Sequence, residues 1–154
     1  KVIINTCAVE NPKFIREASD NFGSSTIVVC IDVKKKFFSG NVVWSNSGSK
    51  SSKYSPKDFA KLMEENGAGE IIIQSINKDG TMSGYDLDLI KEISTTVTIP
   101  VVALGGAGNL EHMIEAYKKG FASALAAGSL FVFQGPKKGV LINYIENSDL
   151  SFFR

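Results

Sequence analysis

The chain has 154 residues, of which 44% are hydrophobic and 10% aromatic, a composition typical of one globular domain. A formal net charge of +1 provides no electrostatic basis for binding nucleic acid or an acidic membrane surface. Because no apolar run is long enough to span a bilayer and the first residues lack a signal-peptide pattern, we expect a cytoplasmic protein.

The cysteines and the histidine argue against disulfides and metals. Cys7 and Cys30 both lie in apolar runs, which predicts buried thiols in a reducing compartment. With a single histidine and no clustered cysteines, a conventional zinc site is not expected, and we predict neither a metal nor a cofactor. His112 lies between acidic neighbours in a predicted helix, and we interpret it as a surface side chain.

The first third of the chain predicts a strand, a helix and a second strand. Residues 2–6 form a strand pattern at the very start, which is typical of a piece of a longer polypeptide. Asn11-Pro12 predicts a helix start with proline at the first helical position, and Gly23 predicts its end. Residues 26–33 predict a buried strand that carries one charge, Asp32, at its C-terminal end.

Residues 34–52 predict a polar loop interrupted by a short hairpin around Trp44, inserted above the sheet. Its three consecutive lysines, Lys34 to Lys36, admit two interpretations. They are either an ordinary solvated loop or a group that attracts phosphates.

The rest of the chain alternates helices and strands. Three helices are predicted, each begun by a capping residue: 56–66 after Ser55, 87–94 after Asp86, and 110–119 after Asn109. Further strands are predicted at 70–76, 99–104 and 122–126. Residues 134–154 show only a weak pattern, with an apolar run at 140–142. Alternation of this kind predicts a parallel sheet with right-handed crossovers.

Small residues follow three of these strands, at Gly80-Thr81, Gly105-Gly106 and Gly128-Ser129. Since the C-terminal ends of parallel strands meet at one rim, these turns should converge there with Asn5-Thr6 and Asp32. Glycine turns and helix starts present backbone N–H groups to anions, so the sequence predicts a phosphate site with one ionisable group. For Gly105-Gly106 alone, an ordinary strand-to-helix turn is the competing interpretation.

Five segments occur in the order and spacing of a known family. They are Asn5-Thr6 with Glu10-Asn11-Pro12, Ile31-Asp32-Val33-Lys34, Gly67-Ala-Gly-Glu70, Asp79-Gly-Thr-Met-Ser-Gly-Tyr-Asp86 and Gly105-Gly-Ala-Gly108. Together they resemble the cyclase subunit of imidazole glycerol phosphate synthase, a (β/α)8 TIM-barrel enzyme of histidine biosynthesis. The resemblance extends to about Phe133, and residues 134–154 diverge. It implies one partial domain over residues 1–154, with residue 1 in the fourth barrel strand and strands 4–8 present.

The resemblance implies a reaction and a partner. The family takes ammonia from a glutaminase subunit and converts a ribulosyl-formimino aminoimidazole carboxamide ribonucleotide to imidazole glycerol phosphate and aminoimidazole carboxamide ribotide. Two aspartates act as general acid and base. Asp32 matches one of them, and the other belongs to the first barrel strand, outside this chain. From the residues alone, Asp32 is more simply interpreted as a loop or turn carboxylate that accepts local N–H groups.

The resemblance also implies two kinds of binding residue. The bis-phosphorylated substrate would lie against residues of the rim loops: Asn5, Thr6, Asp79, Gly80, Thr81, Gly105, Gly106, Gly128 and Ser129. Lys1 and Glu70 match a charged gate at the opposite, N-terminal rim, where ammonia enters from the glutaminase. Without the resemblance, Glu70 is an ordinary charge at a strand start and Lys1 a terminal residue without a role.

Departures from the family pattern leave two alternatives open. Leu104 replaces the usual serine before the glycine turn, Asn77 replaces an aspartate, and residues 131–144 replace the usual last helix. In residues 131–144 the chain looks more like paralogues encoded with surface-polysaccharide genes, which work with a glutaminase in sugar amidation. The other alternative is an inactive half-barrel, since five strands cannot close an eight-stranded barrel. We predict that this chain alone is inactive.

Overall fold

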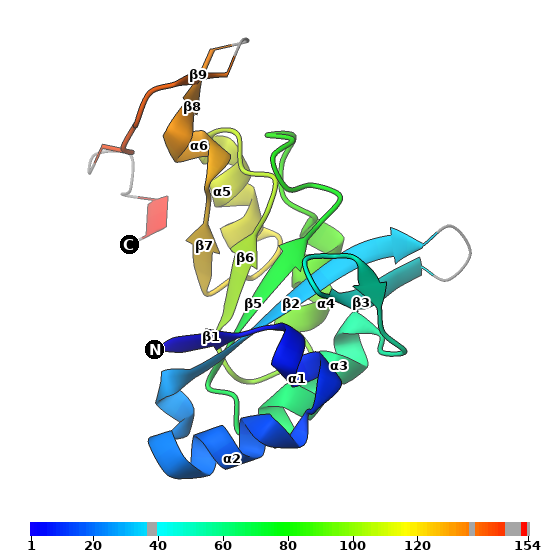
Figure 1. Cartoon of the computed structure of the whole chain (residues 1–154). Coiled ribbons are helices and arrows are strands. Elements are labelled where there is room, and N and C mark those ends of the chain that lie inside the picture. Colours follow the sequence, from blue (N-terminus) through cyan, green and yellow to red (C-terminus); the bar gives the residue numbers. More distant parts are fainter. Residues whose placement is uncertain (37–39, 136–137, 147–151, 154) are drawn as a thin grey trace.

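The structure, a computed structural model, describes residues 1–36, 40–135, 138–146 and 152–153. Its main element is a seven-stranded sheet. Five strands run parallel in the order β1 (Val2–Ile4), β2 (Ile27–Lys36), β5 (Glu70–Ser75), β6 (Val101–Leu104) and β7 (Ala124–Ala126) (Figure 1). Within the described ranges no strand pairing joins β1 to β7, so the sheet stays open.

The two faces of this sheet differ in composition. On β5, the side chains of Ile71 and Ile73 are buried, whereas those of Ile72 and Gln74 are partly exposed. The buried face packs against four helices that lie along the outside of the curved sheet (Figure 1): α2 (Lys13–Phe22), α3 (Pro56–Glu65), α4 (Leu87–Ser94) and α5 (Leu110–Lys118). The strands are therefore anchored by one face, and the other face is available for polar side chains.

Local capping fixes the starts of three of these helices, as the sequence predicts. The side chain of Ser55 accepts from the backbone N–H of Asp58, and the side chains of Asp86 and Asn109 accept from Leu89 and His112 in the same way. Each cap satisfies an N–H group that has no partner inside its helix. None of the helices in the described part of the chain combines the length and apolar composition needed to cross a bilayer.

The first predicted strand is too long. It ends at Ile4, and a one-turn helix, α1 (Thr6–Glu10), follows, begun by Asn5, whose carbonyl accepts from the N–H of Ala8. A five-residue helix is too short to show a helical hydrophobic period, which explains why the sequence pattern missed it. Because Cys7 lies on this helix rather than in a strand, its thiol is exposed, and the prediction that both cysteines are buried is wrong for Cys7.

The second helix also differs in detail. Pro12 precedes it as the capping residue instead of occupying its first turn. Ile15 and Ala18 are buried against the sheet, whereas Phe14 and Phe22 are exposed. Gly23 ends the helix with a φ of +80°, a left-handed conformation that favours glycine. A short 3-10 turn, η1 (Ser24–Thr26), then leads into β2.

The lysine-rich segment is a strand and not a loop. β2 continues to Lys36 and pairs antiparallel with β3 (Gly40–Ser45), which pairs in turn with β4 (Lys50–Ser51). The hairpin is therefore an extension of the main sheet rather than an insertion above it. Asp32 lies within β2, not at its end. Lysine runs have low strand propensity, and cross-strand pairing of these lysines with Gly40, Asn41 and Val42 of β3 outweighs that local preference.

The C-terminal segment extends away from the sheet (Figure 1). A short helix, α6 (Ser129–Val132), leads into a small separate hairpin of β8 (Phe133–Gln134) and β9 (Gly139–Val140). The apolar run at 140–142 is exposed rather than part of the core.

Candidate active site

A row of side chains crosses the open face of the sheet near the C-terminal ends of its strands. Asp32 on β2 is the register partner of Gln74 on β5, and Gln74 is the partner of Leu104 on β6. Leu104 is in turn the partner of Ala126 on β7. Since side chains at paired positions point to the same face, Asp32 lies on the face that the four outer helices leave open.

Asp32 is held by two neighbours. The thiol of Cys30, two residues earlier on the same face, donates to Asp32 Oδ1 at 3.7 Å. The Asn5 amide donates to the Cys30 carbonyl at 2.9 Å, which ties the end of β1 to this part of β2. Burial raises the pKa of the Asp32 carboxyl, and the negative charge of Asp79 adds to the rise, while hydrogen bonds from Asn5 and Cys30 act against it.

Cys30 supports Asp32 as a neutral donor. Burial, together with the adjacent Asp32 carboxylate, raises the pKa of the Cys30 thiol to about 12. The thiol therefore keeps its proton at neutral pH and has little thiolate character. It can hold the Asp32 carboxylate in place but is not a nucleophile.

Asp79 approaches this group from the β5–α4 loop. Gln74 Nε2 donates to Asp79 Oδ2 at 3.4 Å, so Gln74 lies between the two carboxylates. Asp79 is exposed, and its backbone N–H donates to the Ser75 carbonyl at 3.0 Å. Sequence analysis did not select Gln74. The sequence does contain one signal for it, because Gln74 is a polar residue in an otherwise apolar strand.

The glycine turn after β6 packs tightly against the β5–α4 loop. The Gly84 N–H donates to the Gly106 carbonyl at 2.8 Å, and a Cβ on Gly106 would lie 2.2 Å from the Gly84 carbonyl oxygen. A Cβ on Gly108 would lie equally close to the Met82 carbonyl oxygen. Close approach of two loops, rather than of a ligand, is thus what these glycines demonstrably permit.

The other small residues of the rim differ in how closely they are packed. A Cβ added to Gly80 or Gly128 would meet no atom within 4 Å. Gly105, with a φ of +94°, lies against the Ser75 carbonyl. The hydroxyl of Thr81 is engaged within its own loop, where it donates to the Lys78 carbonyl at 2.7 Å, and Ser129 begins α6. The structure therefore brings these predicted residues to one rim, with Gly80 and Gly128 the most open.

Two side chains, those of Tyr85 and His112, make contacts that hold the rim loops in place. The buried Tyr85 hydroxyl donates to the Ala126 carbonyl at 2.9 Å, which joins the β5–α4 loop to β7. Burial raises the pKa of Tyr85 to about 12. His112 is not a simple surface residue, because its Nδ1 accepts from the Gly108 N–H at 3.2 Å and its ring packs beside Gly84.

Asn5 and Thr6 make internal hydrogen bonds. The Thr6 hydroxyl donates to the Asn5 side chain at 3.2 Å and accepts from the backbone N–H of Asn46, in the β3–β4 turn, at 3.0 Å. These side chains connect β1 to the hairpin as well as lying near Asp32.

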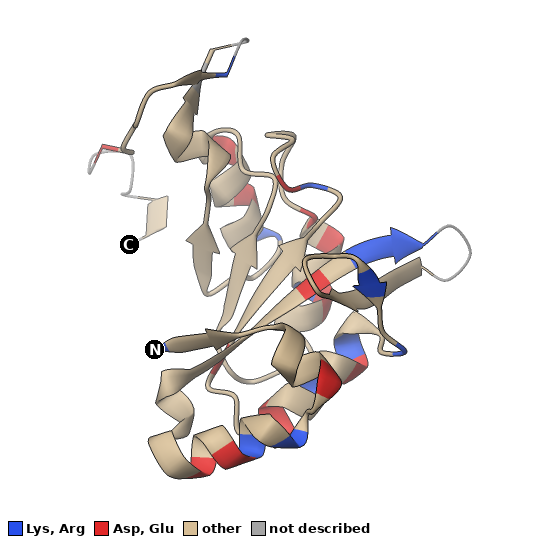
Figure 2. Cartoon of the chain, in the orientation of Figure 1, with Lys and Arg blue, Asp and Glu red and all other residues tan. Residues whose placement is uncertain are grey.

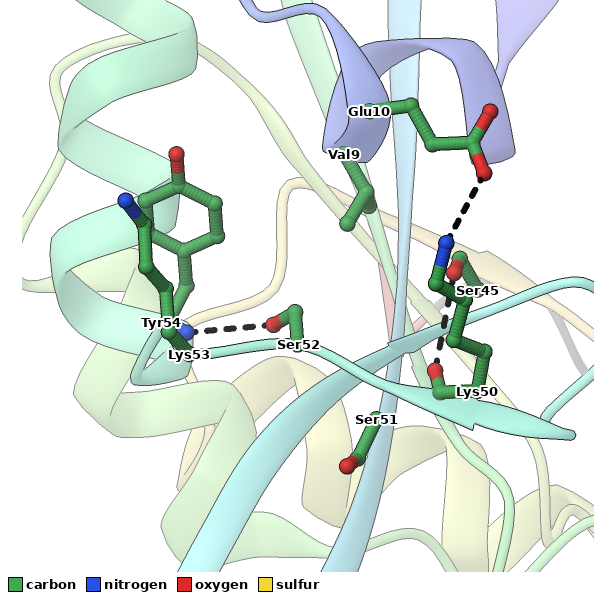
Figure 3. A pocket seen from close by; sticks show the side chains of 8 residues that line it. All are labelled: Val9, Glu10, Ser45, Lys50, Ser51, Ser52, Lys53 and Tyr54. Carbon is green, nitrogen blue, oxygen red and sulfur yellow. Dashed lines mark hydrogen bonds and ion pairs between the residues drawn. The ribbon is translucent and has the colours of Figure 1, made fainter.

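A cavity adjoins this junction. It has a volume of about 350 Å³ and lies between α1 and the segment from β3 to α3 (Figure 3). Glu10 and Lys50 form an ion pair at 3.4 Å on one side, and Tyr54 lies on the other. Among the described residues there is no cluster of three histidine, cysteine or carboxylate side chains that could hold a metal ion.

The charged pair predicted at the opposite rim is present. Lys1 Nζ forms an ion pair with a Glu70 carboxylate oxygen across β2. Glu70 is the register partner of Val28, near the N-terminal ends of the strands. Asp32 lies further toward the C-terminal end of β2. The pair and the rim carboxylates therefore occupy opposite ends of the same open face.

A parallel β/α sheet that is covered by helices on one face, with its loops gathered at the C-terminal strand ends, is compatible with the class of β/α-barrel proteins. The sequence model of the family described as "Histidine biosynthesis protein" matches residues 1–135. The chain belongs to this histidine biosynthesis protein family, whose fold is the (β/α)8 barrel. This confirms the resemblance and the fold class predicted from the sequence.

Several relatives are similar over most of the chain. One, from Pseudomonas aeruginosa, is named "Putative imidazole glycerol phosphate synthase subunit hisF2" and is 44% identical over 94% of this chain and 57% of its own length. Another, from Chlorobium phaeobacteroides, is named "Imidazole glycerol phosphate synthase subunit HisF" and is 47% identical over 87% of this chain and 53% of its own length. The chain thus spans a little over half the length of these relatives.

Proposed function

We propose that the protein containing this chain is an ammonia-dependent cyclase and lyase of the imidazole glycerol phosphate synthase type. Its substrate would be the ribulosyl-formimino aminoimidazole carboxamide ribonucleotide of histidine biosynthesis. The observation that carries the proposal is Asp32, a half-buried carboxyl with a raised pKa on the open face of a histidine-biosynthesis-family sheet. Such a carboxyl can exchange protons with a substrate closer to neutral pH than an ordinary aspartate can.

The surroundings of Asp32 support a positioned substrate. Gly80 and Gly128 leave room for an anionic group near the strand ends, and Asp79 lies beside Asp32 with Gln74 between them. A substrate held by a phosphate at each end has its reactive centre fixed, which contributes more to the rate than a single contact does. In this proposal Asp32 moves protons at that centre, and the glycine loops hold one phosphate.

Ammonia would enter from the other end of the sheet. The Lys1–Glu70 pair lies at the N-terminal strand ends, where a glutaminase partner would dock. An ion pair that opens and closes there can admit ammonia while excluding bulk water. This proposal includes a glutaminase partner, a cytoplasmic location and no cofactor.

A paralogous function is the second candidate. The apolar Leu104, which lies in the row beside Gln74 where the family more usually has a serine, favours it. In that case the same fold and a glutaminase partner would serve the amidation of a surface-polysaccharide sugar. A third candidate is that this chain by itself is an inactive half-barrel, because the parallel strands of its described residues form an open sheet.

Complementation separates these functions. The full-length gene, expressed in a histidine auxotroph that lacks the cyclase subunit but retains its glutaminase, should restore growth without histidine. The same gene with Asp32→Asn should fail, although protein levels on an immunoblot remain equal. Growth of neither strain would contradict the histidine function and favour the sugar function. Equal growth of both would contradict the role of Asp32.

A further inference from the structure

The row that contains Asp32 continues beyond the parallel strands onto the hairpin. Trp44 on β3 is the register partner of Asp32, and Ser51 on β4 is the partner of Trp44. These side chains therefore share the open face with the candidate active site. Figure 2 shows lysines gathered at this end of β2 and on β4, beside the rim.

Two lysines of this group are positioned by the Trp44 ring. Lys34 Nζ lies 5.0 Å and Lys36 Nζ 5.6 Å from the ring centroid, both within the range of cation–π attraction. The indole N–H of Trp44 donates to the Lys34 carbonyl at 3.3 Å, which fixes the ring. A flexible lysine side chain loses conformational entropy when it binds an anion. Because the Trp44 ring already restricts both lysine side chains, this entropic cost is smaller here.

The Ser51 hydroxyl belongs to the same group. Lys36 Nζ donates to Ser51 Oγ at 2.9 Å, so the hydroxyl accepts from the lysine and its own proton can point to a third group. Two ammonium groups and one hydroxyl proton thus converge beside one indole ring. All are donors, which is the chemistry that an oxyanion requires.

The two ammonium charges are not balanced by carboxylates in the part of the chain that the structure describes. Ion pairs join Lys1 to Glu70, Lys50 to Glu10 and Lys119 to Glu115, and no such pair includes Lys34 or Lys36. Two like charges held near one ring repel each other, so an anion between them lowers the electrostatic energy.

We propose that Lys34, Lys36, Trp44 and Ser51 form an oxyanion subsite at the outer end of the rim, and that its ligand is the phosphate group of a sugar phosphate. The inference rests on the proposed function in one respect only, since it takes the sugar phosphate to be a substrate of the same rim. This subsite is separate from the glycine loops, which lie across the parallel strands on the far side of Asp32. It makes β3 and β4 part of substrate recognition.

Intrinsic fluorescence tests this directly, because Trp44 is the single tryptophan of the chain. The 154-residue chain is titrated with ribose 5-phosphate and, separately, with inorganic phosphate, with sodium chloride at matched ionic strength as the reference. A saturable change in Trp44 emission is expected with both phosphates and not with chloride. The Kd for ribose 5-phosphate should be no weaker than that for inorganic phosphate.

Substitutions of the lysines test whether the phosphate binds at this subsite. In the double variant Lys34→Gln, Lys36→Gln the Kd should rise at least about tenfold, the loss expected when charge-assisted hydrogen bonds are removed. The matched control is Lys91→Gln on α4, which removes a lysine that lies 5.7 Å from the ring of Phe121 instead, and its Kd should stay within about twofold of the parent. The double variant Lys34→Arg, Lys36→Arg keeps both charges and should bind. Far-UV circular dichroism confirms that each variant is folded.

Three results would overturn the subsite. They are an emission change that chloride reproduces, an undiminished affinity in the glutamine double variant, and binding of inorganic phosphate with exclusion of ribose 5-phosphate. None of these readouts involves turnover. Failure of the subsite is thus distinguishable from failure of histidine complementation.

Discussion

The two faces of β5 show how this chain separates folding from function. Ile71 and Ile73 point into the helical layer and are almost completely buried, whereas Ile72 and Gln74 alternate with them on the open face. The same alternation on β2 places Ile31 in the core and Asp32 on the open face. The helix-covered face thus stabilises the sheet, and the open face can carry charged and polar groups at a lower cost in stability.

The comparison is tested most strongly by the same substitution on both faces of one strand. Ile73→Ala removes a side chain that is 1% exposed and should lower the free energy of unfolding by about 2–5 kcal/mol, through lost burial and a cavity. Ile72→Ala, on the partly exposed face, should cost distinctly less. Urea unfolding monitored by circular dichroism measures both. Equal losses would contradict the distinction between the faces.

The rim loops offer a second contrast, between two glycines. Gly106→Ala should destabilise the chain by about 1–3 kcal/mol or more, because its φ is +107° and the new Cβ would collide with the Gly84 carbonyl. Gly80→Ala also has a positive φ, +70°, but its Cβ meets open space. Alanine should therefore introduce only backbone strain there. The melting temperature should fall by less than it does for Gly106→Ala. A larger loss for Gly80→Ala would show that the loops do not pack as described.

A smaller effect is expected at the start of the helix that follows this turn. Asn109→Ala removes the acceptor for the His112 N–H and should cost about 1 kcal/mol in urea unfolding, whereas Asn109→Ser, which preserves a capping oxygen, should cost little. Identical losses in the two variants would indicate that the cap does not stabilise α5.

These elements also show what the sequence could predict. The caps at Ser55, Asp86 and Asn109 are local signals, and the predicted helix starts are confirmed. The strand at Lys34–Lys36 depends on pairing with residues 40–42 of β3, which a local pattern does not contain. At the candidate site, the sequence selected Asp32 and Asp79 but missed Gln74, because its place between them arises only when β5 pairs with β2.

The smallest stability effect concerns Asp32 itself and depends on pH. Its pKa is raised in the folded chain above the ordinary value of 3.8, so between these two pKa values folding takes up a proton. The free energy of unfolding should therefore fall as pH rises through this window. Asp32→Asn should remove that slope and be slightly more stable than the parent at neutral pH. A parent that becomes more stable as pH rises through the window would contradict the assigned direction.

The central claim is that Asp32 is a half-buried carboxyl with a raised pKa on the open face, beside Asp79. Carbon-detected NMR of the side-chain carboxyl measures its pKa directly, in the parent chain and in Asp79→Asn. The account predicts a pKa above 3.8 in the parent and a decrease in the variant, since the Asp79 charge is one cause of the rise. A pKa at or below 3.8 in the parent, unchanged by Asp79→Asn, would contradict it.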